Sequence, residues 1–247
     1  MSNGSSAAVA FERVSKAFGP KQVLRDVSFE VRKGEIICIL GRSGTGKSVT
    51  LKLLIALLKP DQGKIWVDRE EITPMKEVQL SRVRRKMGFL FQDAALFDSL
   101  TLYENLALPL QRLTIKSKDE IDATVDTVLQ EVGLRTDKRK KPSELSGGMR
   151  KRAGLARALV LAPKILLADE PSSGLDRITA SEIDDLFLRQ RAADNTTILI
   201  VTHDVHGARK VGDRFAVFDK GDLVAFGTAA EVERSENETA RRLISEG

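Results

Sequence analysis

One eight-residue segment has residue types and spacing that suit the binding of a nucleoside triphosphate. It fits the pattern G-x-x-x-x-G-K-[ST] and reads Gly41-Arg42-Ser43-Gly44-Thr45-Gly46-Lys47-Ser48. In such a loop the backbone N–H groups cradle phosphate oxygens, and the glycines permit close approaches that a side chain would prevent. Lys47 can reach the β- and γ-phosphates, and Ser48 offers a hydroxyl to Mg²⁺. The segment therefore predicts a nucleotide site.

The residues on either side of this loop agree with that prediction. Residues 35–40 form an apolar, strand-like run, and residues 49–54 have the pattern of a helix. The N-terminal end of a helix favours an anion, so Val49 joins the predicted nucleotide-binding residues. The alternative is a glycine-rich turn that matches by chance, and the flanking strand and helix argue against it.

Two adjacent acids, Asp169 and Glu170, follow the apolar strand 165–169. Ligands of open α/β sheets bind at the carboxyl ends of strands, where an Asp can hold Mg²⁺. Glu170 would then lie beside the γ-phosphate and orient or deprotonate the attacking water. The alternative is that both acids cap the turn at Pro171. The phosphate loop upstream favours the catalytic interpretation.

A third cluster, Leu145-Ser146-Gly147-Gly148-Met149, opens a helical run that ends near Pro163. Bare N–H groups, a hydroxyl and the positive end of a helix together suit an anion. By itself the cluster fits an ordinary helix cap with loose glycines better than an anion site. A second anion site becomes useful if it faces a nucleotide held by another copy of the chain. We therefore expect a dimer with ATP between its chains.

The elements that position these residues predict an α/β fold in one domain, residues 9–247, after a flexible tail at residues 1–8. Alternation of apolar and polar residues predicts strands at 9–14 and 24–31, separated by a turn at Gly19-Pro20. Further strands are expected at 64–67, 87–91, 165–169, 197–202, 215–219 and 223–226. Between them, approximately residues 96–162 form an inserted helical subdomain, and a charged helix is expected from Glu231. Buried apolar strands that alternate with helices imply a mostly parallel core sheet.

The composition gives weaker information about function. Lys plus Arg number 40 and Asp plus Glu 35, a net charge of +5 that is too small to indicate nucleic acid. The single cysteine, Cys38, lies in the strand before the phosphate loop and is expected to be buried. No apolar stretch approaches the ~20 residues that span a bilayer, and the N-terminus lacks the features of a secretory signal. We expect a soluble, cytoplasmic protein whose membrane role comes through a partner.

The order of these motifs, with Gln92, Ser173-Gly174-Leu175-Asp176 and His203, resembles the ATP-binding subunits of ABC transporters. The resemblance runs from Val9 to the C-terminal helix. It implies the P-loop NTPase fold of the ABC ATPase type, with an N-terminal antiparallel β-subdomain and an inserted α-helical subdomain. It also implies ATP hydrolysis coupled to transport, ATP and Mg²⁺ as cofactors, a second copy of the chain, a transmembrane permease and attachment to the inner face of the cell membrane.

The resemblance also implies individual roles. Phe18 would stack on adenine, and Gln92 would contact Mg²⁺ and water and link the site to the helical subdomain. Glu170, His203 and Lys47 would be catalytic, with His203 sensing the γ-phosphate. Ser48, Gln92 and Asp169 would hold the metal. The remaining implied contacts lie at the dimer interface, where Ser146, Gly147 and Gly148 bind the partner's γ-phosphate and Asp176 communicates between the chains. His206 matches no motif and is expected at the surface or in a helix.

Residue 149 departs from the family pattern, because most members have Gln where this chain has Met149. We expect phosphate binding to survive that change, since the backbone N–H groups and Ser146 remain. Residues 142–152, 91–97 and 174–179 resemble the Mla-type ATPases, which move phospholipids between bacterial membranes with a permease and an MCE-domain protein. An ABC ATPase of another importer or exporter, for amino acids or lipoproteins, is the alternative.

Two other function classes receive less support. A chromosome or DNA-repair ATPase needs coiled-coil arms, and the chain has no sustained heptads. A nucleic-acid module based on residues 138–141 lacks the aromatic residues that stack on bases. Four apolar residues could form the permease-docking surface or belong to the core, namely Leu96, Phe97, Leu100 and Leu102.

Overall fold

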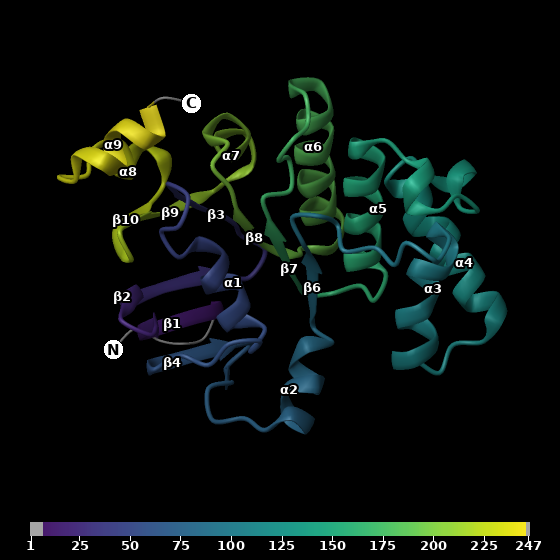
Figure 1. Cartoon of the computed structure of the whole chain (residues 1–247), viewed down its shortest axis with the longest axis horizontal. Coiled ribbons are helices and arrows are strands. Elements are labelled where there is room, and N and C mark those ends of the chain that lie inside the picture. The colour runs from purple at the N-terminus through teal and green to yellow at the C-terminus, as the bar shows by residue number, and fades with distance from the viewer. Residues whose placement is uncertain (1–6, 246–247) are drawn as a thin grey trace.

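A mostly parallel sheet occupies the middle of the molecule in the computed structural model, which describes residues 7–245 (Figure 1). In that part of the chain its strand order is β10-β9-β3-β8-β7-β6, and only β10 is antiparallel to its neighbour. The strands are β3 (Ile36–Gly41), β6 (Met87–Leu90), β7 (Ile165–Asp169), β8 (Thr197–Val201), β9 (Arg214–Asp219) and β10 (Asp222–Gly227). Their apolar runs are buried because helices or a second sheet cover each face. The α/β prediction with a mostly parallel core sheet is confirmed.

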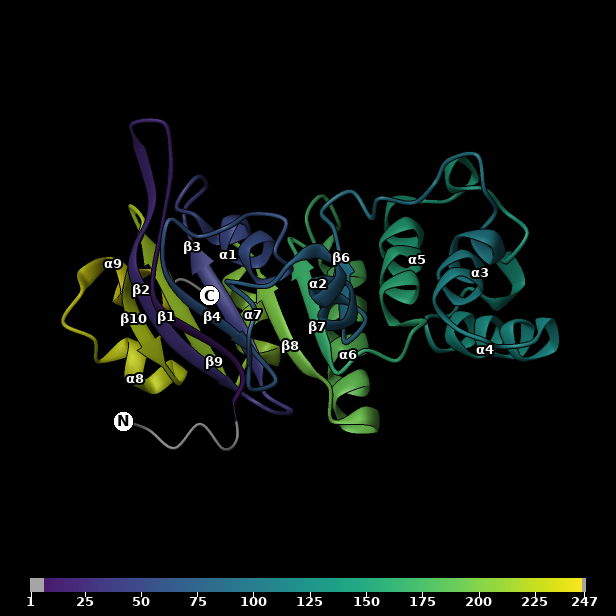
Figure 2. The ribbon, with the colours of Figure 1, turned by 90° about the horizontal axis from the view of Figure 1, so that it is seen from below.

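The second sheet is antiparallel, with the order β2-β1-β4-β5. It consists of β1 (Ala7–Phe18), β2 (Lys21–Arg32), β4 (Gln62–Val67) and β5 (Glu70–Glu71). The β1–β2 hairpin turns at Gly19-Pro20, as expected, and extends beyond the parallel sheet (Figure 2). Because β1 begins at Ala7, the last two residues of the expected tail belong to a strand, and Ala8 is buried. The rest of that tail, residues 1–6, lies outside the described residues.

The hydrophobic core lies in two layers, one on each face of the parallel sheet. Successive side chains of a strand point to opposite faces, and β3 supplies both layers. Ile36 and Cys38 pack with the larger set of helices, whereas Ile37 and Ile39 pack with the antiparallel sheet, α1 and α2. Cys38 is fully buried, as expected, and burial raises the pKa of its thiol. The sheet is therefore held between two apolar layers and forms a rigid platform for the residues at its edge.

Helices cover both faces of the platform. On the side of the antiparallel sheet lie α1 (Lys47–Leu54) and α2 (Glu77–Arg84). On the other face lie α5 (Gly147–Leu159), α6 (Arg177–Asp194), α7 (Val205–Val211), α8 (Ala229–Glu233) and α9 (Glu238–Ser245). The same apolar core continues through α5 to α3 (Leu102–Leu113) and α4 (Lys118–Glu131). The charged helix expected from Glu231 is thus two helices, α8 and α9. The break fits the sequence between them: the Ser235 hydroxyl accepts a hydrogen bond from the Asn237 backbone N–H, and the Asn237 side chain accepts one from the Ala240 N–H in the first turn of α9.

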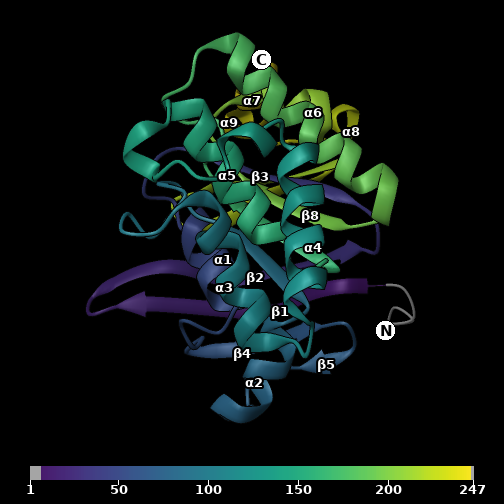
Figure 3. The same cartoon turned by 90° about the vertical axis from the view of Figure 1, so that its right-hand side faces the viewer.

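Helices α3, α4 and α5 gather at the end of the molecule away from the antiparallel sheet, and Figure 3 looks onto that end. Capping boxes at Thr101 and Ser117 begin α3 and α4. Short 3₁₀ turns at Arg135–Asp137 and Pro142–Glu144 lead to α5. Helix α5 packs against α3 and α4 and also against β6 of the platform. Helix α5, which begins at the Ser146 cluster, therefore joins the helical subdomain to the sheet.

Candidate functional site

The phosphate loop connects the end of β3 to the start of α1, as the sequence predicts. Gly46 has φ 101°, in the left-handed region that favours glycine, and it directly precedes α1. A Cβ at Gly46 would lie 2.6 Å from the carbonyl oxygen of Val23 on β2. Backbone angle and close approach thus both require glycine here. The loop is held between the two sheets, at the carboxyl edge of the parallel one.

Lys47 is the buried cation of this loop, with 6% of its surface exposed. Its Nζ donates hydrogen bonds to the carbonyl oxygens of Gly41, at 2.7 Å, and Arg42, at 3.1 Å. Burial lowers the pKa of Lys47, while the carboxylates of Glu170 and Asp169 act in the opposite direction. A buried ammonium beside the first turn of a helix is suited to phosphate oxygens, which would replace the carbonyl partners.

Ser48 and Asp169 meet although 121 positions separate them in the sequence. The Ser48 hydroxyl donates to Asp169 Oδ1 at 2.8 Å. Burial raises the pKa of Asp169, and the Ser48 hydrogen bond opposes that shift. Among residues 7–245 no group of three or more His, Cys, Asp or Glu could hold a metal. The hydroxyl and single carboxylate instead fit Mg²⁺, which commonly takes one or two protein ligands together with waters and phosphate oxygens.

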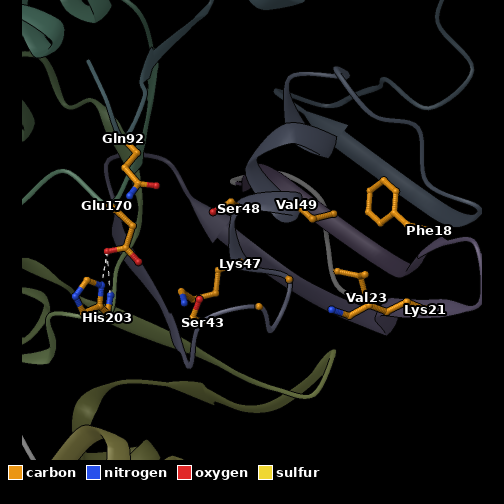
Figure 4. Close-up of a pocket in the computed structure, with 12 residues that line it drawn as sticks. Phe18, Lys21, Val23, Ser43, Lys47, Ser48, Val49, Gln92, Glu170 and His203 are labelled. Carbon is orange, nitrogen blue, oxygen red and sulfur yellow. Dashed lines mark hydrogen bonds and ion pairs between the residues drawn. The ribbon is translucent and has the colours of Figure 1, made fainter. Parts of the chain in front are cut away.

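Glu170 and His203 form a direct pair at the ends of β7 and β8. Glu170 Oε2 lies 2.7 Å from His203 Nδ1, and the His203 backbone N–H donates to the same oxygen at 3.3 Å (Figure 4). Glu170 has φ 48°, an uncommon left-handed angle for a non-glycine residue, and its N–H donates to the carbonyl of Val201. The carboxylate is largely buried while the imidazole is exposed. An ionised carboxylate in this position can accept a proton from water.

Lys47, Ser48, Glu170 and His203 line one cavity of about 670 Å³, whereas Asp169 is not part of its lining. Its lining consists of Phe18, Lys21, Val23, Ser43, Gly44, Gly46, Lys47, Ser48, Val49, Gln92, Glu170 and His203. Phe18 lies at one end, and Glu170 and His203 lie at the other, with the phosphate loop between them (Figure 4). Phe18 is 46% exposed, so part of its ring is accessible to a base. The cavity thus places an aromatic ring, a phosphate loop and a carboxylate in the order that a nucleoside triphosphate needs.

Sequence reasoning missed Lys21 and Val23. Both come from β2, where residues two apart share a face of the strand. No motif marks them, because their place in the cavity depends on how the β1–β2 hairpin crosses the phosphate loop. His206 lies on the exposed surface of α7, as expected.

The Ser146 cluster lies outside that cavity. Ser146 caps α5, and its side chain accepts a hydrogen bond from the Met149 N–H at 3.2 Å. Gly147 and Gln92 line a second, separate cavity of about 260 Å³, so Gln92 borders both. Asp176 caps α6 and accepts from the N–H groups of Ile178 and Thr179, which lowers its pKa. Within the described chain, the cluster and the phosphate loop do not form one site.

Residues 24–173 match the sequence family described as ABC transporter. The chain belongs to this family. Proteins similar to it include the probable ribonucleotide transport ATP-binding protein mkl of Mycobacterium leprae, 44% identical over 96% of this chain and 69% of that protein. Another is the methionine import ATP-binding protein MetN 1 of Bacillus cereus ATCC 10987, 40% identical over 91% of this chain and 66% of that protein. The chain spans about two thirds of the length of these ABC relatives.

Solved ABC cassettes share the fold. The dimeric post-hydrolysis state of the ATP-binding cassette MJ0796, bound to ADP and Pi, has a TM-score of 0.83 and 32% identity, covering 89% of this chain and 98% of that one. The cbiO1 structure from Clostridium perfringens, part of the ABC transporter complex cbiONQ, has a TM-score of 0.86 and 29% identity, covering 97% and 95%. The chain is therefore an ABC ATPase that uses ATP and Mg²⁺ and drives a transporter. None of its helices within residues 7–245 has the length and apolar character to cross a membrane.

Proposed function

We propose that this ABC ATPase drives phospholipid movement between bacterial membranes, on the cytoplasmic face of a permease and together with an MCE-domain protein. The support is the resemblance of its motif neighbourhoods to Mla-type ATPases, above all Met149 in place of the usual Gln. In the structure Met149 lies in the first turn of α5 and is partly buried against the helical core. Its side chain thus belongs to packing, which is consistent with phosphate binding through the backbone N–H groups of this turn.

In the proposed hydrolysis cycle, the residues at the carboxyl edge of the parallel sheet have separate roles. Ser48 and Asp169 would hold Mg²⁺, which neutralises charge on the phosphates when bound. Lys47 exchanges its carbonyl partners for phosphate oxygens and stabilises the charge that develops during phosphoryl transfer. Glu170 accepts the proton of the attacking water, and the 2.7 Å contact with His203 orients its carboxylate.

We further propose that the site is completed by a second copy of the chain. Ser146, Gly147 and Gly148 would bind the γ-phosphate held by the partner, and Asp176 would lie near the same interface. The support is twofold: Gly147 of this cluster lines a cavity other than the nucleotide cavity of its own chain, and the similar cassette MJ0796 is dimeric. Gln92 borders both cavities, so it is the residue proposed to report nucleotide occupancy to the helical subdomain.

The four apolar residues considered for the permease-docking surface differ in how exposed they are. Leu102 is fully buried and belongs to the core, while Leu96 and Leu100 are half-buried. Phe97 is 51% exposed, and the guanidinium of Arg157 lies 6.0 Å from its ring centre. An exposed aromatic ring beside a cation is a common anchor in protein interfaces. We therefore assign the docking contact to Phe97 among these four residues.

A different substrate is the second candidate, because the relatives named above are a probable ribonucleotide transport protein and a methionine import protein. A subunit that binds nucleotide needs no cargo cavity, so the permease determines the cargo. Identification of the permease that copurifies with the chain would distinguish these cargoes.

Purification of the complex from membranes and reconstitution into lipid vesicles tests the phospholipid proposal. With a fluorescent phospholipid and ATP, we expect lipid transfer to the partner protein and a several-fold rise in ATP turnover. The matched control is the same complex with Glu170→Gln, which should transfer no lipid. A complex whose turnover responds to ribonucleotide or to methionine, with no lipid transfer, would overturn the phospholipid assignment.

A further inference from the structure

Lys151, on α5, is a buried cation to which the proposed hydrolysis cycle assigns no role. Only 7% of its surface is exposed. Its Nζ donates hydrogen bonds to the backbone carbonyl of Gln92, to the backbone carbonyl of Glu170 at 3.1 Å and to the Ser173 hydroxyl at 3.2 Å. A lysine ammonium has three N–H donors, and here each has an acceptor. The three acceptors belong to two loops of the candidate site, because Glu170 and Ser173 both lie between β7 and α6 and Gln92 lies after β6.

The charge of Lys151 is balanced by acids of the same region. Burial lowers the pKa of its ammonium, and the carboxylates of Asp93, Glu170 and Asp169 oppose that shift. Displacing this buried ammonium is costly, because its three hydrogen bonds would be lost together. Lys151 therefore links helix α5 by hydrogen bonds to the loops that contain Gln92 and Glu170.

Two more residues of α5 hold the loop that follows Gln92. Residues three apart on a helix lie on one face, and Lys151, Gly154 and Arg157 have this spacing. A Cβ at Gly154 would lie 2.7 Å from the Cβ of Ala94, so glycine allows the loop to touch the helix. The Arg157 guanidinium donates to the carbonyls of Ala94, at 3.3 Å, and Ala95, at 2.5 Å.

This face of α5 has a direct connection to the Ser146 cluster, because Ser146 caps the same helix. A helix moves as a rigid element over so short a length, so a shift of Ser146 displaces Lys151 as well. Any such displacement acts on the backbones of Gln92 and Glu170, through the hydrogen bonds described above. Glu170 is sensitive to it, since its backbone already has the uncommon φ of 48°.

We propose that Lys151 is a positioning residue for ATP hydrolysis. Its ammonium holds the Glu170 and Gln92 backbones against α5, so that the carboxylate of Glu170 reaches its working position only when the Ser146 end of that helix is in place. This inference rests on the proposed catalytic role of Glu170. It assigns Lys151 an effect on turnover and none on nucleotide affinity, because Lys151 does not line the nucleotide cavity.

The test compares turnover and nucleotide affinity in the full-length chain. Lys151→Met keeps the length of the side chain but removes the donors, and Lys151→Arg keeps the charge and the donors. Turnover is measured as phosphate release at saturating ATP, and affinity as the Kd of a fluorescent ATP analogue. The matched control is Lys86→Met, since Lys86 bridges Asp68 and Glu70 at the start of β6, at the opposite edge of the sheet.

We expect Lys151→Met to lower kcat at least about tenfold while Kd changes less than about threefold, and Lys151→Arg to recover most of the loss. Lys86→Met should leave both quantities within about twofold of the unchanged protein. A kcat of Lys151→Met within about twofold of the unchanged protein, or an equal loss in affinity, overturns the proposal. Should that variant fail to fold, Lys151→Gln is measured in the same way and judged by the same limits.

Glu170→Gln separates the failure of this inference from the failure of the catalytic assignment. If Glu170→Gln hydrolyses ATP at the normal rate, the role of Glu170 is wrong and the positioning role of Lys151 falls with it. If Glu170→Gln is inactive and Lys151→Met is fully active, only the Lys151 inference is wrong.

Discussion

Asp184, in α6, illustrates at the scale of a single residue how burial sets the charge state of an acid. It is 8% exposed and lies close to Gly207 of α7. Burial raises the pKa of Asp184 to about 6. Lys210 and, more weakly, His206 lower this pKa, whereas the neighbouring acids Asp204 and Asp185 raise it further. The folded protein thus binds a proton at Asp184 more tightly than the unfolded chain does, since an unfolded Asp titrates near 4.

The sign of the pH effect follows from that comparison. An acid whose folded pKa is raised disfavours folding when it is ionised, so its unfavourable contribution is present above pH 6 and disappears as the pH falls toward 4. We predict that Asp184→Asn raises the stability at pH 8 by about 1 kcal/mol, or about 2–4 °C in Tm. At pH 5 the gain should be roughly half as large, because that pH lies midway between the folded pKa of about 6 and the unfolded value near 4.

Thermal unfolding followed by circular dichroism at pH 5 and pH 8 measures the difference. Asp185→Asn is the control, since Asp185 lies on the same helix with half of its side chain exposed. Its Tm should show no comparable dependence on pH. An Asp184→Asn gain of the same size at both pH values would contradict the burial argument.

At the scale of elements, the contact between α5 and α6 deserves a direct test because it connects the Ser146 cluster to the segment after Glu170. Gly148, in the first turn of α5, faces Thr179, in the first turn of α6. A Cβ at Gly148 would lie 2.4 Å from Thr179 Cγ2. The Thr179 hydroxyl donates to Asp176 Oδ2 at 2.8 Å, so rotation of the side chain away from a new Cβ would break that bond.

We predict that Gly148→Ala destabilises the protein by about 1–3 kcal/mol, a typical cost of overpacking. Adding Thr179→Ser removes the clashing methyl group and keeps the hydroxyl that bonds Asp176. The double variant should therefore regain most of the lost Tm, and Thr179→Ser alone should lose little. Failure of the second substitution to restore Tm would show that the close approach of these two residues is not the cause.

At the scale of the whole molecule, the described chain separates the phosphate loop from the Ser146 cluster, each beside its own cavity. In a two-fold symmetric dimer each proposed site would combine Lys47 of one chain with Ser146 of the other. This arrangement makes a prediction about mixtures of inactive chains. Lys47→Ala and Ser146→Arg should each abolish turnover when tested alone. In a dimer of identical variant chains, both sites lack either the Lys47 ammonium or a working Ser146 cluster.

Mixing these two variants in equal amounts should restore roughly a quarter of the normal phosphate release, because half of the dimers are mixed and each contains one intact site. Mixing Lys47→Ala with Glu170→Gln is the control. Both changes affect the same half of the site, so no mixed dimer has an intact one and turnover should stay absent. A mixture of the first pair that remains inactive, although the chains associate, would contradict the shared site.

Much of the fold was predictable because its signals are local. Strand β7 ends where the apolar run meets Asp169, and α3 and α4 begin at their capping boxes. The C-terminal region was predicted less well, because the charges after Glu231 do not reveal the break between α8 and α9. The same limit applied to Leu96, Phe97, Leu100 and Leu102, since apolar character alone does not separate core from surface.

The sequence by itself determined the chemistry of this protein, because a phosphate loop, a carboxylate at a strand end and a glycine-tipped helix are each defined by neighbouring residues. Only the tertiary structure decided which distant groups meet. Ser48 bonds Asp169 across 121 positions, and Lys151 bonds Gln92 across 59. Such contacts depend on how helices and strands pack over the whole chain, and the packing energy is spread over many apolar residues that no single motif contains.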